Sequence, residues 1–232
     1  MPELTYNLFR QPKRKTLSIS VGQDCRITVK VPSRLSEQEI NSFIRKKSSW
    51  ILKKIAFNQK VRKPYTPKKF TEGENFLYLG RSCPLSIRTH PGSRMRVIFD
   101  GIHLNLFLPT SRIISSDSQV QKLTQWYKSR AVFCINRRVS FYSRMLKIFP
   151  ESIKIKTLNR SWGNCSKKGV VSFNWKLIMA PLAIIDYVVV HELCHLTEHN
   201  HSKKFWKLLS SFSPSYKCHR QWLNIHYNQL RL

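Results

Sequence analysis

The motif HELCH, at residues 191–195, constrains this chain more than any other stretch of its sequence. If the segment is helical, His191 and His195 project from the same face one turn apart, so both imidazoles can reach one metal ion. Glu192 would lie beside the ion without binding it, within reach of a water molecule whose proton it can take. Zinc prefers nitrogen ligands in a tetrahedral set, and catalytic zinc usually has three protein ligands and one open position. The motif therefore predicts a zinc site with a third ligand elsewhere in the chain.

Two histidines after the motif are candidates for that third ligand. His199 continues the spacing of four, but on an unbroken helix it would lie about 12 Å along the axis from His191, too far to share an ion with it. His201 is the better candidate, because Asn200 tolerates the left-handed conformation in which helices end, and the chain can turn there. The alternative is an ordinary amphipathic helix that carries two histidines by chance.

The helical conformation of this segment is itself a prediction against local propensity. The β-branched run IIDYVVV, at residues 184–190, favours a buried strand. Pro181 at a first helical position and the length of the apolar segment favour a long buried helix instead, in which packing overrides propensity.

The formal net charge of +29, from 41 Lys and Arg residues against 12 Asp and Glu residues, is the most unusual property of the composition. Such a chain is expected to have an anionic partner, which nucleic acid, an anionic membrane surface or an acidic substrate would provide. The alternative is a generally basic proteome, in which the charge has no specific partner. The hydrophobic fraction of 41% excludes a disordered chain, and 232 residues suffice for one large domain or two small ones.

Six cysteines are scattered along the chain without a CxxC pair, so neither a zinc knuckle nor a disulfide framework is predicted. No segment is long and apolar enough for a membrane span, and the first residues lack the apolar region of a signal peptide. We therefore expect a soluble, cytoplasmic protein with reduced thiols; the sequence leaves its oligomeric state open.

Strand patterns dominate the first half of the chain. The first three predicted strands form a small antiparallel sheet, and the other four form hairpins, with the Asp-Gly pair at residues 100–101 as the strongest turn signal. The predicted strands are residues 4–9, 17–21, 26–31, 76–79, 84–89, 94–99 and 102–108. Between the two groups, a helix begins after Ser36, with Glu39 at the capping-box position, and runs to about Phe57 with Trp50 in its apolar stripe.

The second half begins with another long helix, predicted from Asp117 to about Ile148. Strands at residues 153–158 and 170–175 are predicted to form a hairpin, and short amphipathic helices follow His201.

Four segments together are far more specific than the HExxH pattern alone. They are WGNC at 162–165, the following strand with Asn174, DYVVVHELCH at 186–195 and NHSKKFW at 200–206. Their combination resembles the YgjP-like zinc metallopeptidase family, which is related to WLM and SprT-type proteins. The resemblance is strongest over residues 160–223 and less specific in the N-terminal part. One departure is Asn164, where the family commonly has serine.

The resemblance implies an α+β, zincin-like metallopeptidase domain with an active-site helix and a backing helix against a small sheet. This domain would occupy residues 113–232, after a β-rich N-terminal region with one amphipathic helix at 1–112. The resemblance also implies that Zn2+ is the cofactor, with His191, His195 and His201 as ligands and Glu192 as general base.

In related zincins, the strand before the active-site helix pairs with an extended substrate, and residues 170–175 would be that strand. Arg160, Trp162 and Asn174 are the candidate substrate-binding residues. Core packing is the alternative for Trp162. Arg160 would stabilise a developing oxyanion, bind an acidic group or form a structural salt bridge. Cys194 is expected to be a buried filler, and Tyr187 to pack near a ligand.

The leading functional prediction is hydrolysis of a protein or peptide by a zinc-activated water, with Glu192 as base. One alternative is hydrolysis of a nucleotide or another phosphoanhydride at the same metal, which would suit the basic surface. Another is a nucleic-acid-binding protein in which zinc is structural. A peptidase recruited to nucleic acid would combine two of these functions.

Overall fold

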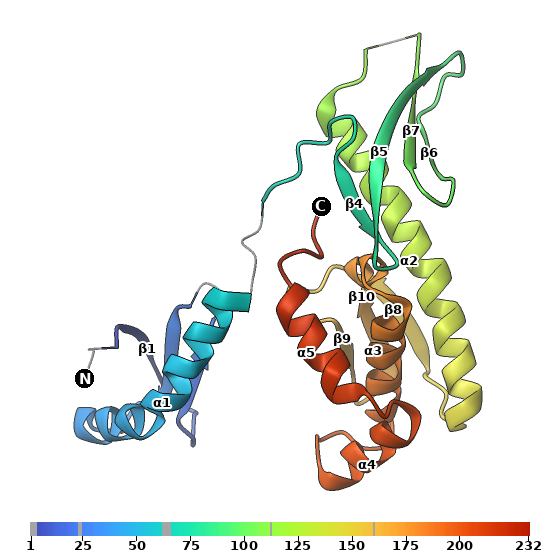
Figure 1. Cartoon of the computed structure of the whole chain (residues 1–232). Helices are drawn as coiled ribbons and strands as arrows, with labels where there is room; N and C mark the ends of the chain where they lie inside the picture. Colours follow the sequence, from blue (N-terminus) through green and yellow to red (C-terminus); the bar gives the residue numbers. More distant parts are fainter. Residues whose placement is uncertain (1–3, 23–24, 62–65, 112, 160) are drawn as a thin grey trace. The chain divides into compact units, whose positions relative to one another are not determined.

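The computed structural model describes all residues except 1–3, 23–24, 62–65, 112 and 160 (Figure 1). The chain forms two compact units, Met1–Pro64 and Tyr65–Leu232. The division differs from the boundary predicted at residue 112, because the strands between residues 75 and 109 share the hydrophobic core of the second unit.

The first unit is a three-stranded sheet followed by one helix. Its elements are β1 (Tyr6–Gln11), β2 (Ser18–Val21), β3 (Ile27–Pro32) and α1 (Glu37–Val61). The strand order is β1-β3-β2, with β3 antiparallel to β2 but parallel to β1. The prediction of an antiparallel sheet is therefore wrong for β1. A chain that reverses twice regains its first direction, so the third strand is parallel to the first when they are neighbours.

Helix α1 begins with the predicted capping box. The Ser36 hydroxyl accepts a hydrogen bond from the Glu39 amide at 3.3 Å, and the Glu39 carboxylate accepts one from the Ser36 amide at 2.9 Å. Trp50 does not belong to the buried stripe, because it lies about 100° around the helix from Ile51 and is 48% exposed. The small core of this unit consists of residues from β3 and α1, namely Ile27, Val29, Val31, Ile40, Ile44 and Ile51.

The second unit begins with a four-stranded sheet. Its strands are β4 (Asn75–Tyr78), β5 (Arg81–His90), β6 (Arg96–Phe99) and β7 (Leu104–Pro109), in the order β4-β5-β7-β6. The two hairpins are present, and they meet along the parallel pair β5 and β7. The predicted turn after β6 is held by Asp100, whose carboxylate accepts hydrogen bonds from the amides of Ile102 at 2.9 Å and His103 at 2.7 Å.

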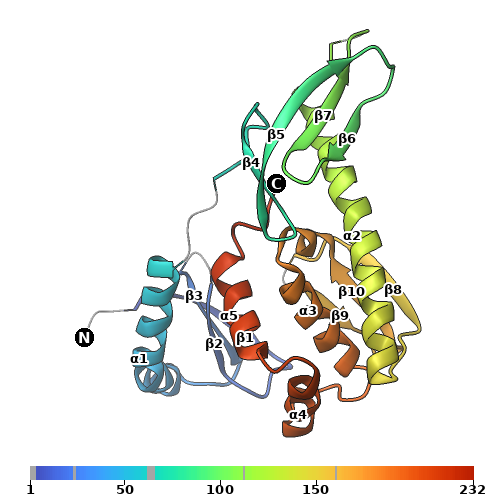
Figure 2. The same cartoon turned by 45° about the vertical axis from the view of Figure 1, so that its right-hand side comes forward.

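Helix α2 (Ser116–Leu146) is the long helix predicted from Asp117. It begins at the N-cap Ser115, and its end is marked by Lys147 in the left-handed conformation with φ 56°. Figure 2 shows α2 running from the four-stranded sheet past α3 (Leu182–Cys194). The residues that α2 buries recur every four positions, namely Leu123, Tyr127, Ala131, Ile135, Val139 and Ser143.

A second, smaller sheet lies beside α3 and has the order β8-β10-β9. Its strands are β8 (Ser152–Lys156), β9 (Gly163–Cys165) and β10 (Val170–Asn174). The predicted hairpin of residues 153–158 with 170–175 is wrong, because β10 is parallel to β8 and forms its hairpin with β9. The turn before β10 contains Gly169 with φ 74°, and it reverses the chain directly from β9 into β10.

After β10 the chain continues through the 3-10 helix η1 (Trp175–Met179), α3, α4 (Lys203–Phe212) and α5 (Tyr216–His226). Helix α3 is apolar nearly all round and is correspondingly buried, so packing overrides the strand propensity of its β-branched run. Pro181 is its N-cap, one residue before the predicted position. Among the described residues, no helix is both long and apolar enough to cross a membrane.

An ion pair fixes α3 against α2. The Arg138 guanidinium donates two hydrogen bonds to the Asp186 carboxylate, from Nε to Oδ1 at 2.5 Å and from Nη2 to Oδ2 at 2.9 Å. Both side chains are mostly buried, so this bidentate pair sets how the two helices align in the core.

Candidate metal centre

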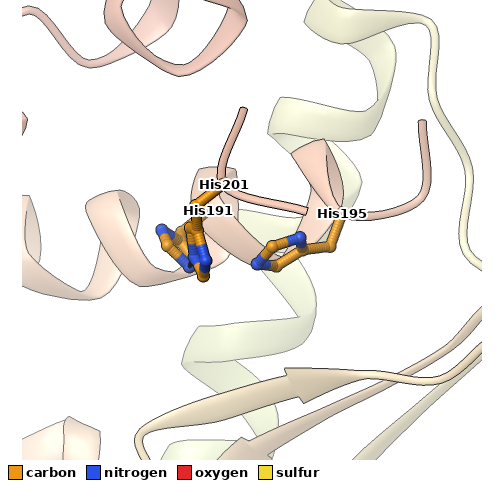
Figure 3. Close-up of side chains that lie close together, drawn as sticks. All are labelled: His191, His195 and His201. Carbon is orange, nitrogen blue, oxygen red and sulfur yellow. Dashed lines mark hydrogen bonds between the residues drawn. The ribbon is translucent and has the colours of Figure 1, made fainter. Parts of the chain in front are cut away.

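Three imidazoles converge at the C-terminal end of α3 (Figure 3). One ring nitrogen from each of His191, His195 and His201 lies within 4.8 Å of the others. His191 lies in the last turn of α3, His195 caps the helix, and His201 comes from the segment that leads into α4.

The chain returns to the site by a different route from the one predicted. Helix α3 ends at Cys194, and the following turn is closed by hydrogen bonds from the Leu196 amide to Leu193 and from the Thr197 amide to Cys194. Asn200 is not among the described residues with a positive φ, so the predicted left-handed turn there is wrong. The three histidines meet because the helix stops at the motif itself.

The ring nitrogens are placed as metal ligands would be. The Nε2 atoms of His191 and His201 are 3.1 Å apart. Two ligands of one tetrahedral zinc, each about 2.0–2.1 Å from the ion, are roughly 3.3 Å apart. The two rings thus point toward one position, in a geometry close to that of a shared ion.

The tautomer of His195 follows from its backbone contact. Its Nδ1 lies 3.0 Å from the carbonyl oxygen of Glu198, and because a carbonyl only accepts, Nδ1 carries the proton. In the neutral ring, the lone pair is then on Nε2, free to bind a metal. Burial, aided by electrostatic interactions with His195, His201 and Arg220, lowers the pKa of His191 to about 3, so the His191 ring is also neutral near pH 7.

Two aromatic side chains of α4 pack against the imidazoles. Phe205 is fully buried and stacks on His195, with ring centroids 4.5 Å apart, and Trp206 stacks on His201 at 5.4 Å. The N-cap Ser202 accepts a hydrogen bond from the Phe205 amide at 3.2 Å and thereby starts α4 directly after His201. This explains the spacing in NHSKKFW, a segment that the sequence indicated only through its family resemblance and as the start of an amphipathic helix.

Glu192 is 5% exposed, and burial raises its pKa to about 8. Its carboxyl group packs on the backbone of β9 at Gly163. A Cβ atom at residue 163 would lie 2.6 Å from both Cγ and Oε1 of Glu192. Glycine in WGNC therefore makes room for the carboxyl group, a role that sequence reasoning did not assign.

A cleft of about 310 Å³ opens in front of Glu192 and His191. Trp162 and Tyr227 form one wall, with ring centroids 5.3 Å apart. Arg220, from α5, contributes a cation that sequence reasoning missed. Three histidines that could hold a metal ion and a buried carboxyl group beside an open cleft form an arrangement that can hydrolyse a bound substrate.

Comparison with known proteins decides the family. A family model described as YgjP-like, metallopeptidase domain, matches residues 15–226, which is most of the chain. This chain belongs to the YgjP-like family.

The resemblance found in the sequence is thus confirmed, and the YgjP-like chain is a metallopeptidase. No curated protein matches it. Among solved structures, it is similar to the metallopeptidase zymogen of Pyrococcus abyssi abylysin, with a TM-score of 0.34 and 17% identity over 39% of this chain and 92% of that chain.

The outcome differs for each of the three candidate substrate-binding residues of this YgjP-like domain. Trp162 borders the cleft, so its contact with substrate stays a prediction. Asn174 is 4% exposed, and its amide donates to the carbonyls of Leu158 at 2.8 Å and Ser161 at 3.4 Å. These bonds hold the loop before β9 in place, and a direct contact of Asn174 with substrate is untested. Arg160 lies outside the described residues.

The strand predicted to pair with substrate is the wrong one. β10 is the central strand, with β8 on one edge and β9 on the other, so an extended peptide finds no free edge on it. β9 is an edge strand of this sheet among the described residues, and it packs against α3.

The sequence correctly placed Tyr187, one turn before His191, and Cys194, within the motif. The Tyr187 ring packs near His191, with centroids 5.8 Å apart. Cys194 is fully buried, and burial raises the pKa of its thiol to about 12, which leaves it an inert filler.

Proposed function

We propose that this YgjP-like metallopeptidase is a zinc enzyme in which His191, His195 and His201 hold the ion and Glu192 is the general base. One observation carries the proposal: three imidazoles converge on one point beside a buried carboxyl group that lines a cleft.

The donor set suits zinc. All three donors are imidazole nitrogens, and three protein ligands leave a tetrahedral ion one open position. When bound, zinc supplies a Lewis acid that brings the pKa of a water molecule toward neutrality and polarises a carbonyl group.

The chain's own residues supply the proton transfers and the alignment. The Glu192 carboxylate takes a proton from the attacking water and later delivers it to the leaving amine nitrogen. Because burial disfavours the charged form of Glu192, its carboxylate holds an accepted proton more firmly than an exposed carboxylate would. The free edge of β9 offers backbone N–H and C=O groups to an extended peptide, which places the scissile bond in front of Glu192.

The test combines metal analysis with peptide cleavage. Purified protein should contain one zinc per chain by mass spectrometry of the metal and should cleave a protein-derived peptide library. Glu192→Gln should keep the zinc and lose cleavage, His201→Ala should lose both, and Glu151→Gln, an exposed carboxyl group away from the cleft, should lose neither. A wild-type protein that holds no stoichiometric divalent metal would refute the proposal.

A second candidate is hydrolysis of a nucleotide at the same site. The exposed Arg220 cation in the cleft and the net charge of +29 favour an anionic substrate of this kind. Nucleotides assayed in parallel with peptides separate the two candidates, since peptide turnover without nucleotide turnover dismisses this one.

Recruitment to nucleic acid is a separate proposal, supported by α1. Lys46, Trp50 and Lys53 are exposed along one face of this helix, where an aromatic ring between two cations suits a nucleic acid strand. Oligonucleotide affinity that falls steeply with salt, and that falls further in Trp50→Ala, is the expected result.

A further inference from the structure

Arg220 is a cation at the rim of the cleft that the proposed mechanism does not use. It projects from α5, and its guanidinium lies over the Trp206 ring, 5.8 Å from the centroid. Trp206 in turn stacks on His201 at an interplanar angle of 25°. This stack ties Arg220 to the end of the cleft where the three histidines meet.

Arg220 has no anionic partner in the part of the chain that the structure describes. Its guanidinium forms no ion pair there, whereas Arg138 in the same unit is paired with Asp186. Glu192, which shares the cleft, is not within ion-pair distance of Arg220. The cleft therefore presents a positive charge that nothing in its described surroundings neutralises.

The charge of Arg220 lies inside the cleft. Arg220 lines the same cleft as Tyr187, His191 and Glu192. Its positive charge therefore lies where a substrate would lie.

We propose that Arg220 is an anion subsite that binds a carboxylate of the peptide substrate near the scissile bond. The proposal rests on the proposed peptidase function and names the substrate class of that site. A guanidinium stacked on an aromatic ring keeps its N–H groups free at its edge, where they match the two oxygens of a carboxylate. A peptide carries a carboxylate on an acidic side chain or at its free C-terminus.

The experiment compares matched peptides on the zinc-loaded full chain. A peptide library is cleaved first to find scissile sites, and one cleaved peptide is then made with Glu or Gln near the bond and with a free or amidated C-terminus. The wild type should cleave the carboxylate-bearing member roughly 10-fold better, as expected for one charge-assisted hydrogen bond at a partly exposed site. If the change from Glu to Gln abolishes the preference, the carboxylate is that of an acidic side chain. If amidation abolishes it, the carboxylate is that of the free C-terminus.

Variants of one residue then test the assignment. Arg220→Gln should abolish the preference, and Arg220→Glu should reverse the preference toward a basic peptide. Lys217→Gln, which removes an exposed cation one turn away on α5 and outside the cleft, should leave the preference unchanged. A reversed preference cannot arise from a merely destabilised fold.

Binding separates failure of this proposal from failure of the peptidase function. Fluorescence anisotropy of the labelled Glu and Gln peptides on Glu192→Gln protein measures the preference without hydrolysis. If peptides are cleaved but the Glu and Gln members behave alike in wild type and Arg220→Gln, the subsite is refuted and the peptidase stands. If nothing is cleaved but binding still prefers the acidic peptide through Arg220, the peptidase fails and the subsite stands. Tighter Arg220-dependent binding of ATP than of the acidic peptide would overturn the assignment to carboxylate.

Discussion

Substitution of Gly163 by alanine should disable Glu192 without removing the metal site. The new Cβ would lie 2.6 Å from Cγ and Oε1 of Glu192, whereas ordinary contacts begin at 3.4 Å. The carboxyl group must therefore move by nearly 1 Å, since the competing atom belongs to the backbone-anchored strand β9. A misplacement of about 1 Å in a catalytic group can reduce the rate by roughly 100-fold.

The expected result for Gly163→Ala is a fall of kcat/KM by roughly 100-fold, or about 2.7 kcal/mol of transition-state stabilisation. The zinc content should be unchanged, because the three atoms nearest to the new methyl group all belong to Glu192 and none to a histidine. Overpacking should also lower the free energy of unfolding by about 1–3 kcal/mol, measured by urea denaturation.

The matched control is Asn164→Ala, which changes the next residue of β9, an exposed side chain, and should retain near wild-type activity. In the Glu192→Gln background, Gly163→Ala should have little further effect, because both changes act on the same carboxyl group. Gly163→Ala protein that folds, binds zinc and keeps kcat/KM within about threefold of wild type would refute this reasoning.

Three further predictions concern the support of the site. Phe205→Ala should lower the free energy of unfolding by about 3–5 kcal/mol and weaken zinc binding, because this fully buried ring packs on the imidazoles. Urea denaturation and metal titration measure the two effects, and Phe205→Leu should show a smaller loss in each. Asp186→Asn should lower the free energy of unfolding in urea by about 1–3 kcal/mol, because it leaves Arg138 unpaired. In a double-mutant cycle, the same substitution should cost less in the Arg138→Met background. Chelation of the metal should lower the melting temperature of wild type but not of His201→Ala, because only a protein that binds the ion gains stability from it; equal shifts would contradict the assignment of His201.

Local rules predicted several elements well. The capping box of Ser36 and Glu39 is present because both partners lie within one helical turn. The turn after β6 and the long helix α2 likewise depend on residues close in sequence. Trp50 was wrongly assigned to the buried stripe, because the other apolar residues of α1, and not the hydrophobicity of Trp50 itself, decide which face of the helix is buried.

Strand pairing was predicted less well. The sequence indicates where strands are, but β1 with β3, β5 with β7 and β8 with β10 are parallel pairs that no local turn specifies. A parallel pairing joins segments that are distant in the chain, so its formation depends on the packed core rather than on a turn motif.

Helical periodicity by itself determined that His191 and His195 share one face of α3 and that Glu192 lies beside them. Tertiary structure decided the rest of the site. His201 reaches the other histidines because α3 stops at the motif and α4 packs its aromatic residues behind them. Gly163 and Arg220 reach the cleft from β9 and α5, about 30 residues away on either side of Glu192. Spacing of a few residues fixes neighbours on one helix, whereas contacts between separate elements exist only after the core has assembled.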